Sequence, residues 1–198
     1  MEEVELPNPE ELGERKGKAF TRRVALATAI FAVVLAIASL GEKNAMKEMI
    51  LAQQQASDSW AFYQAKALRE HQYRTQKFRL EVDLAERGPG MKPAVRQKFE
   101  TLLTTFADEE KRYNAEKKEI EQEAKKLEHE RDVNRAKDPY FDFAEALLQI
   151  AIVMSSIAIL SNSRSVFFFS LVLAVLGALL TINGYNLIIK LPFLHSGH

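Results

Sequence analysis

Few residues of this chain have the types and spacing that catalysis or metal binding requires. The sequence contains no cysteine, which excludes disulfides, thiolate nucleophiles and cysteine metal ligands. His195 and His198 stand three residues apart in "HSGH", a pattern more typical of adventitious metal binding than of a built site. Nucleophile triads, phosphate-binding glycine loops and paired carboxylates in a cleft are not recognisable. We therefore predict no catalytic residue, no cofactor and no metal site, and we expect the protein not to be an enzyme.

The polar residues within apolar segments are the remaining candidates, because charged groups inside a membrane usually mark transport or proton paths. Glu145 lies near the outer end of one such segment, where we expect it to reach the interface or to pair with a base such as Lys137. The uncharged polar residues are more typical of hydrogen bonds between helices than of a pore lining: Gln149, Ser155, Ser156, Thr181 and Asn183. A channel formed around an axis between several copies remains an alternative.

Three apolar segments predict the transmembrane helices that would position these polar residues. They cover residues 24–40, 144–160 and 166–185, and the first contains 17 residues without a charge. The first segment could instead be a secretory signal cleaved near residues 36–38, because basic residues precede it. The helical pattern continues into Glu42 without a break, however, which favours a retained anchor.

The basic residues near these segments predict an orientation in a bacterial inner membrane. The polar tail at residues 1–23 ends in five bases, and Arg164 lies in the link between the second and third segments. Only Lys190 follows the third segment, in the tail at residues 186–198. By the positive-inside rule, the amino terminus and the Arg164 link are cytoplasmic. The central region and the carboxyl terminus are then expected in the periplasm, although three further bases precede the second segment on that side: Arg131, Arg135 and Lys137.

The region between the first two segments, residues 41–138, predicts two long helices. A turn sequence, "RGPGMKP" at residues 87–93, separates arms at residues 42–86 and 94–137 that contain neither proline nor glycine. Because the arms are similar in length and rich in helix-forming residues, we predict a long antiparallel coiled-coil hairpin in an all-α integral membrane protein with three transmembrane helices. Residues 41–142 carry 20 basic and 20 acidic residues, which indicates a solvated surface and no nucleic-acid site.

Each arm has an incomplete apolar seam. In the second arm one apolar or aromatic residue recurs every seventh position, namely Phe99, Phe106, Tyr113, Ile120 and Leu127. The half-way positions are mostly acidic: Leu102, Glu109, Glu116, Glu123 and Glu130. In the first arm the expected seam residues are Met46, Met49, Ala56, Trp60, Tyr63 and Ala67, followed after a drift through His71 and Arg74 by Phe78, Val82 and Ala85. The drift predicts a locally unwound or polar section, and the thin core predicts that neighbouring copies or partners complete it.

The second arm is expected to end at Pro139, because proline breaks a helix interior. Three aromatic residues follow this position, namely Tyr140, Phe141 and Phe143. Such a group is typical of an aromatic belt at a membrane interface. The second transmembrane helix would then begin after the break, at Ala144.

Small residues and one aromatic cluster are the candidate packing surfaces. All three apolar segments carry small residues at helical spacing, which permit close helix contact in lipid. These residues are Ala25, Ala29, Ala32, Ala36 and Ser39, then Ala151, Ser155 and Ala158, then Ser170, Ala174, Gly177, Thr181 and Gly184. Trp60, Phe62 and Tyr63 cannot all face one seam, so we expect Phe62 to contact a neighbouring copy. The expected partners are the lipid bilayer, further copies of the chain and an optional protein partner on the hairpin.

The layout of the chain resembles a family of bacterial proteins grouped as the domain of unknown function 4337. The resemblance covers roughly residues 20–190 and is most distinctive in "QASDSWAFYQAK" at residues 55–66 and in "DPYFDFAEALLQIAIV" from Asp138. It implies a helical integral membrane protein and brings no activity or site residues. We therefore expect a non-enzymatic, self-associating scaffold or sensor, and the alternative is a subunit of an oligomeric channel or transporter.

Overall fold

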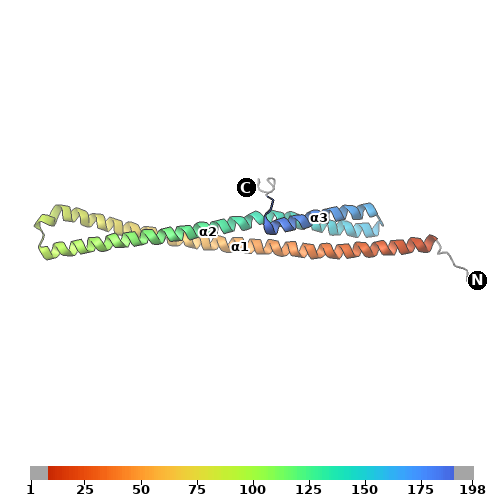
Figure 1. Cartoon of the computed structure of the whole chain (residues 1–198), viewed down its shortest axis with the longest axis horizontal. Coiled ribbons are helices and arrows are strands. Elements are labelled where there is room, and N and C mark those ends of the chain that lie inside the picture. The colour runs from red at the N-terminus through yellow and green to blue at the C-terminus, as the bar shows by residue number, and fades with distance from the viewer. Residues whose placement is uncertain (1–8, 190–198) are drawn as a thin grey trace, which may run out of the picture. The chain divides into compact units, whose positions relative to one another are not determined.

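The structure, a computed structural model, describes the backbone of residues 9–189 and the side chains of residues 17–189. Three α-helices follow one another along the chain: α1 (Pro9–Arg87), α2 (Pro93–Leu160) and α3 (Arg164–Asn186) (Figure 1). No strand occurs within the described residues, so the predicted all-α class is confirmed. The beginning of the polar tail, together with Lys190, His195 and His198, lies outside the described residues.

Helix α1 is continuous from the polar tail through the first apolar segment and the whole first arm. It begins at Pro9, well before the apolar segment that starts at Val24. The predicted continuation of the helix into Glu42 is confirmed. No local unwinding occurs where the apolar pattern drifts, because the helix runs without interruption to Arg87.

The predicted helix break at Pro139 is wrong, because Pro139 lies inside α2. A proline in a helix interior removes one hydrogen bond and costs about 3 kcal/mol. The next two residues, Tyr140 and Phe141, are 0% and 1% exposed. Burying a large aromatic side chain contributes about 1.5–3 kcal/mol, so the burial of this pair is large enough to offset the cost of the proline.

The breaks that do occur coincide with the predicted turn and link. A short 3-10 helix, η1 (Gly88–Gly90), ends where the Met91 amide donates to the Gly88 carbonyl at 3.3 Å. Pro93 then begins α2, a position where proline has no amide hydrogen bond to lose. Between α2 and α3, Asn162 takes a left-handed conformation with a φ of 47°, which asparagine tolerates well.

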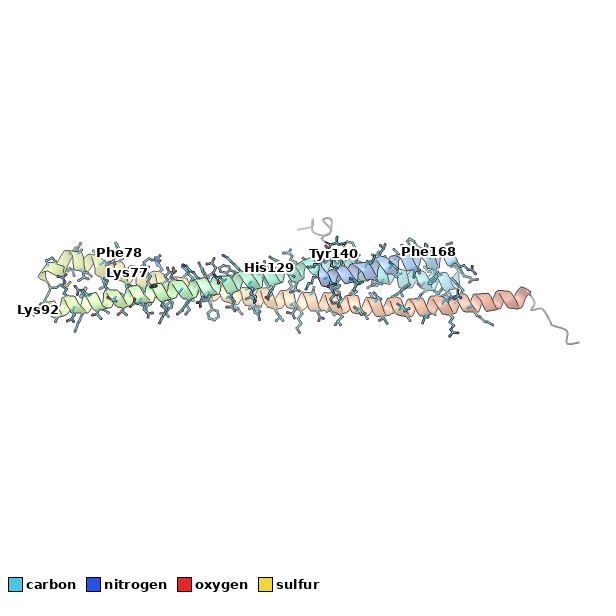
Figure 2. The ribbon with its side chains drawn as sticks, in the orientation of Figure 1. Lys77, Phe78, Lys92, His129, Tyr140 and Phe168 are labelled. Carbon is cyan, nitrogen blue, oxygen red and sulfur yellow. The ribbon has the colours of Figure 1, made fainter. Side chains whose placement is uncertain are left out.

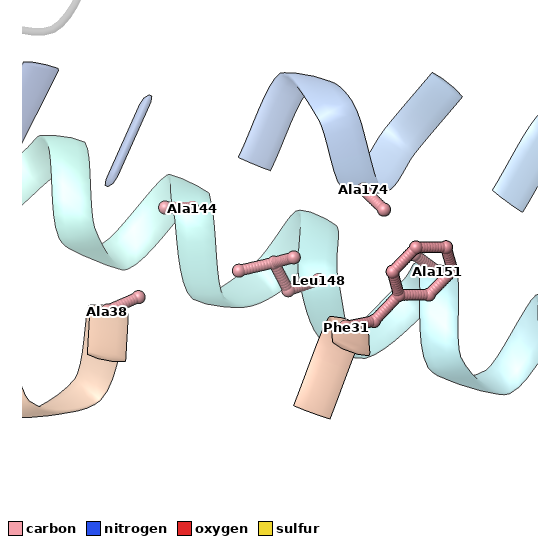
Figure 3. Packing of buried hydrophobic residues seen from close by; sticks show 6 residues of the cluster. All are labelled: Phe31, Ala38, Ala144, Leu148, Ala151 and Ala174. Atoms are coloured by element: carbon pink, nitrogen blue, oxygen red, sulfur yellow. The ribbon is translucent and has the colours of Figure 1, made fainter. Parts of the chain in front are cut away.

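The chain forms two compact units. The three-helix unit comprises Met1–Glu48 and Val133–His198, and the two-helix unit comprises Met49–Asp132. The core of the three-helix unit is mostly small residues around one phenylalanine and one leucine (Figure 3): Phe31, Ala38, Ala144, Leu148, Ala151 and Ala174. Each of the three helices also contains a stretch long and apolar enough, by length and composition, to cross a membrane.

Three glycines of this unit make room for the two large side chains of α2. A Cβ atom placed on Gly41 or on Gly184 would lie 2.5 Å or 2.9 Å from Cε1 of Phe141. A Cβ atom on Gly177 would lie 2.8 Å from Cγ of Leu148. The Phe141 ring therefore fits between α1 and α3 only because both helices have glycine where they meet it.

In the two-helix unit, successive residues of α1 contact residues of α2 in reverse order. Trp60 Nε1 donates to Glu128 Oε1 at 3.0 Å, Lys66 pairs with Glu116, and Arg74 Nε donates to Glu110 Oε1 at 2.8 Å. The Tyr73 ring stacks on the Tyr113 ring, with 5.6 Å between their centroids.

The seam between these helices follows one continuous heptad, which differs from the predicted seam. The partly or fully buried seam residues alternate three and four apart: Ala52, Ala56, Ser59, Tyr63, Lys66, Glu70, Tyr73, Lys77, Leu80 and Leu84 of α1, and Leu103, Phe106, Glu110, Tyr113, Lys117, Ile120, Ala124, Leu127 and Arg131 of α2. The second arm has a second set of seam positions, half-way between those that recur every seventh residue. This set begins at Leu103, which is partly buried, and not at the predicted Leu102, which is exposed. Several predicted seam residues are exposed instead: Met46, Phe78, Val82, Ala85, Glu123 and Glu130. Figure 2 labels Phe78, which is 63% exposed.

Candidate functional site

The small-residue stripes of α2 and α3 are buried within the three-helix unit. All five predicted α3 residues are buried: Ser170, Ala174, Gly177, Thr181 and Gly184. Their partners on α2 include the other predicted stripe, since the Ser155 hydroxyl donates to the Ser170 hydroxyl at 3.0 Å. Ser170 in turn donates to the Phe167 carbonyl, and Thr181 to the Gly177 carbonyl. These polar groups therefore act as hydrogen-bond partners between and along the helices.

The stripe of α1 lies on a different surface, exposed on the outside of the unit. Ala25, Ala29, Ala32 and Ala36 are all exposed. Helix α1 instead packs through a different set of residues, which recur every seventh position and are buried: Val24, Phe31, Ala38 and Ala45. A third face carries bulky exposed side chains: Leu26, Ile30, Val33 and Ile37. The alanine stripe is thus a smooth strip that no other part of the described chain covers.

The aromatic cluster on α1 divides between the seam and the surface. Trp60 and Tyr63 are partly buried, with their rings edge to face at 5.3 Å. Phe62 is 63% exposed. The structure therefore brings Trp60 and Tyr63 together against α2 and leaves Phe62 in solvent.

Four carboxyl groups gather where α1 and α2 leave the predicted membrane segments. Glu42 of α1 faces Asp138, Asp142 and Glu145 of α2, and its carboxyl group shares a hydrogen bond with that of Glu145. Burial raises the pKa of Glu42, and the nearby carboxylates raise it further. Burial also raises the pKa of Asp142, again with help from its acidic neighbours. The cluster therefore favours the protonated form of Glu42 more than water does.

The expected pairing of Glu145 with Lys137 is not formed. Lys137 Nζ donates to Asn134 Oδ1 at 3.0 Å, and Oε1 of Glu145 is buried without a hydrogen-bond partner. The sequence carried a signal for this cluster, because Asp138, Asp142 and Glu145 are four and three residues apart on one helix face.

A buried charge network in the two-helix unit escaped sequence reasoning. Glu70 is 3% exposed and accepts hydrogen bonds from Arg74 at 2.6 Å, Asn114 at 2.9 Å and Lys117 at 2.6 Å. Glu110 accepts from Lys77 at 2.6 Å and from Arg74. Hydrogen bonds from Lys117 and Asn114 lower the pKa of Glu70, and those from Lys77 and Arg74 lower the pKa of Glu110. The network lies where the apolar pattern of the first arm drifts, so the sequence indicated a locally unwound or polar section there but not these ion pairs.

In the part of the chain that the structure describes, no three or more His, Asp or Glu side chains are grouped to hold a metal ion. The features that the geometry does provide are an uncovered alanine strip, an exposed Phe62, a carboxyl cluster and a buried charge network.

Comparison with known proteins gives one match. The model of the family described as "Domain of unknown function (DUF4337)" matches residues 20–187. Searches of the curated proteins and of the solved structures found no similar protein.

Proposed function

Because the chain belongs to the DUF4337 family, whose description names no activity, we propose its function from its own residues. It is a non-enzymatic integral membrane protein that associates with further copies of itself. It presents an antiparallel coiled-coil hairpin outside the membrane as a scaffold or sensor. The observation that carries this proposal is the apolar outer surface of the three-helix unit.

That outer surface is incompatible with exposure to water. Only 22%, 28% and 22% of the apolar windows of α1, α2 and α3 are buried inside the chain. Leu26 and Phe168 are each 66% exposed, and Leu179 is 58% exposed. A soluble protein rarely exposes continuous apolar patches of more than a few hundred Å². A lipid bilayer would cover this surface, and three spans of this length fit its thickness.

The hairpin is supported by the reversed order of contacts in the two-helix unit and by its surface composition. The contacts from Trp60–Glu128 to Arg74–Glu110 are those of two antiparallel helices joined by the turn at residues 87–93. The seam alternates three and four residues apart, which is the spacing of a coiled coil. The surrounding surface is charged and balanced, so this part belongs in water.

Self-association is supported by the alanine strip of α1. Helices in lipid associate through close backbone approach at small residues, not through hydrophobic burial. In α2 and α3 the equivalent stripes are used within the chain, whereas Ala25, Ala29, Ala32 and Ala36 remain exposed. A second copy that presents the same strip would cover it.

The location we propose is the inner membrane of a bacterial cell, with the hairpin in the periplasm. The bases that precede the first apolar segment, and Arg164 at the start of α3, then lie on the cytoplasmic side. A second candidate function, as a subunit of a channel or transporter, is favoured by the carboxyl cluster around Glu42 and Glu145, since acidic groups at the end of a membrane segment can line the mouth of an ion or proton path.

Cysteine cross-linking tests the self-association directly, because the natural chain contains no cysteine. Single variants Ala29→Cys and Ala32→Cys in native membranes are expected to form disulfide-linked dimers under mild oxidation. Ile30→Cys is the matched control, since Ile30 is 56% exposed on the neighbouring bulky face. Equal cross-linking of all three variants, or of none, would reject the alanine strip as an interface.

Topology and transport are tested with the same cysteine-free background. A membrane-impermeant maleimide is expected to label Gly90→Cys from the periplasmic side and Ser161→Cys only after the membrane is opened. Labelling of both from one side would reject three spans in this arrangement. Ion flux across proteoliposomes that contain the protein would favour the channel or transporter over the scaffold.

A further inference from the structure

One end of the three-helix unit holds a cleft with two arginines and an aromatic wall. The cleft has a volume of 410 Å³ and lies between α1 and α3. Arg23 of α1 and Arg164 of α3 line it, and Phe20, Phe167, Phe168 and Leu171 form most of the remaining wall. The Phe20 and Phe167 rings meet edge to face at 5.9 Å, which packs the two helices together at this point.

The two arginines form no ion pair with any side chain that the structure describes. Among the described side chains that line the cleft, none is Asp or Glu. The side chain of Ser163, the residue before α3, does not cap the helix, so the positive end of the helix dipole adds to the charge of Arg164. Two guanidinium groups from different helices thus line the same cleft.

The chemistry of the wall identifies the kind of anion. Guanidinium groups bind phosphate with paired hydrogen bonds. On α3 the cleft is lined by Arg164 and then by Phe167, Phe168 and Leu171. These three apolar residues belong to the predicted third span, which begins at Val166, so the lining changes from charged to apolar along α3. A free phosphate would leave that apolar wall unused, whereas a phospholipid would place its phosphate on the arginines and its acyl chains along Phe168 and Leu171 (Figure 2 labels Phe168).

We propose that this cleft binds the headgroup of an anionic phospholipid, with Arg23 and Arg164 holding its phosphate. The proposal rests on the membrane location proposed above, and it agrees with the assignment of this end to the cytoplasmic leaflet, which is rich in anionic lipid. It goes further than the positive-inside rule, because that rule gives every basic residue of the tail the same role. Here Arg22, next to Arg23 in sequence but absent from the cleft, has no part in the binding.

The test measures lipid retained by the full-length protein in neutral detergent. Native mass spectrometry counts bound phosphatidylglycerol for the natural chain, for the double variant Arg23→Gln with Arg164→Gln, and for the single variant Arg22→Gln. The double variant is expected to bind phosphatidylglycerol at least about tenfold more weakly, since the loss of one charged hydrogen bond changes the dissociation constant by about that factor. Arg22→Gln and the natural chain are expected to bind equally, and phosphatidylcholine is expected to bind weakly to all three.

Several outcomes would overturn the site. Loss of binding in Arg22→Gln as large as in the double variant would show attraction by the basic tail as a whole. Equal retention of phosphatidylcholine, or displacement of phosphatidylglycerol by an equal concentration of inorganic phosphate, would reject an anionic lipid as the ligand. Circular dichroism of the variants shows whether each is folded, and Arg23→Lys with Arg164→Lys replaces the double variant if it is not, with reduced binding again expected because lysine lacks the paired donors.

Alkaline extraction of membranes separates this proposal from the one on which it depends. The natural chain and the double variant are both expected to stay in the membrane pellet. A variant that stays in the pellet and retains its phosphatidylglycerol overturns only the lipid site. Release of the natural chain by alkali overturns the membrane proposal and the lipid site with it.

Discussion

Lys117 Nζ of α2 lies 2.6 Å from Glu70 Oε2 of α1, and Glu70 is almost fully buried. This ion pair occupies two seam positions of the two-helix unit, where a coiled coil ordinarily has apolar residues. Asn114 and Arg74 donate to the other carboxylate oxygen, so the buried charge of Glu70 is fully satisfied. We therefore expect the pair to fix the register of the two helices more than it adds to their stability.

Removal of one partner of this pair is expected to destabilise the two-helix unit strongly. In Glu70→Gln the Lys117 ammonium loses its counter-charge while still mostly buried, and breaking a buried ion pair in this way costs about 3 kcal/mol. Thermal unfolding of the full chain in detergent, followed by circular dichroism, measures the loss. Glu119→Gln, an exposed glutamate on α2, is the control and is expected to change little.

The double variant Glu70→Leu with Lys117→Leu separates stability from register. Replacement of both partners by apolar residues is expected to restore most of the melting temperature, because no charge is then left buried. A double variant as unstable as Glu70→Gln would contradict this account of the pair.

Acid is expected to weaken the same network. Because its ion pairs lower the pKa of Glu70 below the usual 4.5, the stability they contribute is complete above pH 4.5 and is lost as the pH falls through the lowered pKa. Glu110 follows the same rule with its partners Lys77 and Arg74. Hydrogen exchange around residues 70 and 117 should therefore accelerate below pH 4.5 after correction for the intrinsic rate. The Glu70→Leu and Lys117→Leu double variant should lose the part of this dependence that comes from Glu70.

The carboxyl cluster of the three-helix unit is expected to respond in the opposite sense. The pKa of Glu42 is raised above 4.5 by burial, by its hydrogen bond to Glu145 and by Asp138 and Asp142. Its contribution is therefore complete below pH 4.5 and is lost as the pH rises through the raised pKa. After correction for the intrinsic rate, amide exchange at residues 38–45 should be slower at pH 4.5 than at pH 7. Glu42→Gln, which mimics the protonated form, should remove the part of this difference that comes from Glu42. Exchange that accelerates on acidification in the natural chain would refute this sign.

The fit of Phe141 between two glycines predicts a sharp size limit. In Gly184→Ala the added Cβ would lie 2.9 Å from the ring, and such overpacking costs about 1–3 kcal/mol. Phe141→Leu should rescue this variant in part, because the smaller side chain makes room for the methyl group. Gly17→Ala is the matched control, since no atom lies within 4 Å of its new Cβ, and it should leave the melting temperature unchanged or slightly higher. Additive losses in the Gly184→Ala and Phe141→Leu double variant would argue against contact between the two positions.

The helices themselves could be predicted from local sequence, because their causes are local. Two long segments without proline or glycine, and a turn containing both, define α1 and α2 around residues 87–93. Three apolar segments identify where each helix is apolar enough to cross a membrane. Pro139 misled the prediction, since the burial of Tyr140 and Phe141 within the three-helix unit, which offsets the cost of the proline, depends on residues far away in sequence.

The pairing of the helices could be predicted only in part, because it depends on residues far apart in sequence. The heptad from Phe99 to Leu127 contains seam residues, but hydrophobicity pointed to Leu102 where the seam uses Leu103. In α1 the seam passes through Lys66, Glu70 and Lys77, each neutralised by a charged residue of α2. The pattern along α1 alone cannot show that a charged residue of α1 is paired by a residue of α2. The predicted seam of α1 therefore used apolar residues that are exposed in the structure, such as Phe78.

Phe62 provides the last prediction, on the association of copies through the hairpin. Phe62 and Phe78 lie on the same helix and are both 63% exposed, so a polar replacement removes the same apolar area at each. Only Phe62 lies beside the Trp60 and Tyr63 cluster, where an aromatic contact with a second copy would contribute about 1 kcal/mol beyond its area. Phe62→Ser is therefore expected to lower the dimer fraction several-fold near the dissociation constant, measured by sedimentation in detergent, whereas Phe78→Ser leaves it unchanged. Equal effects at both positions would mean that the hairpin associates through its general apolar surface, and no effect at either would confine association to the alanine strip of α1.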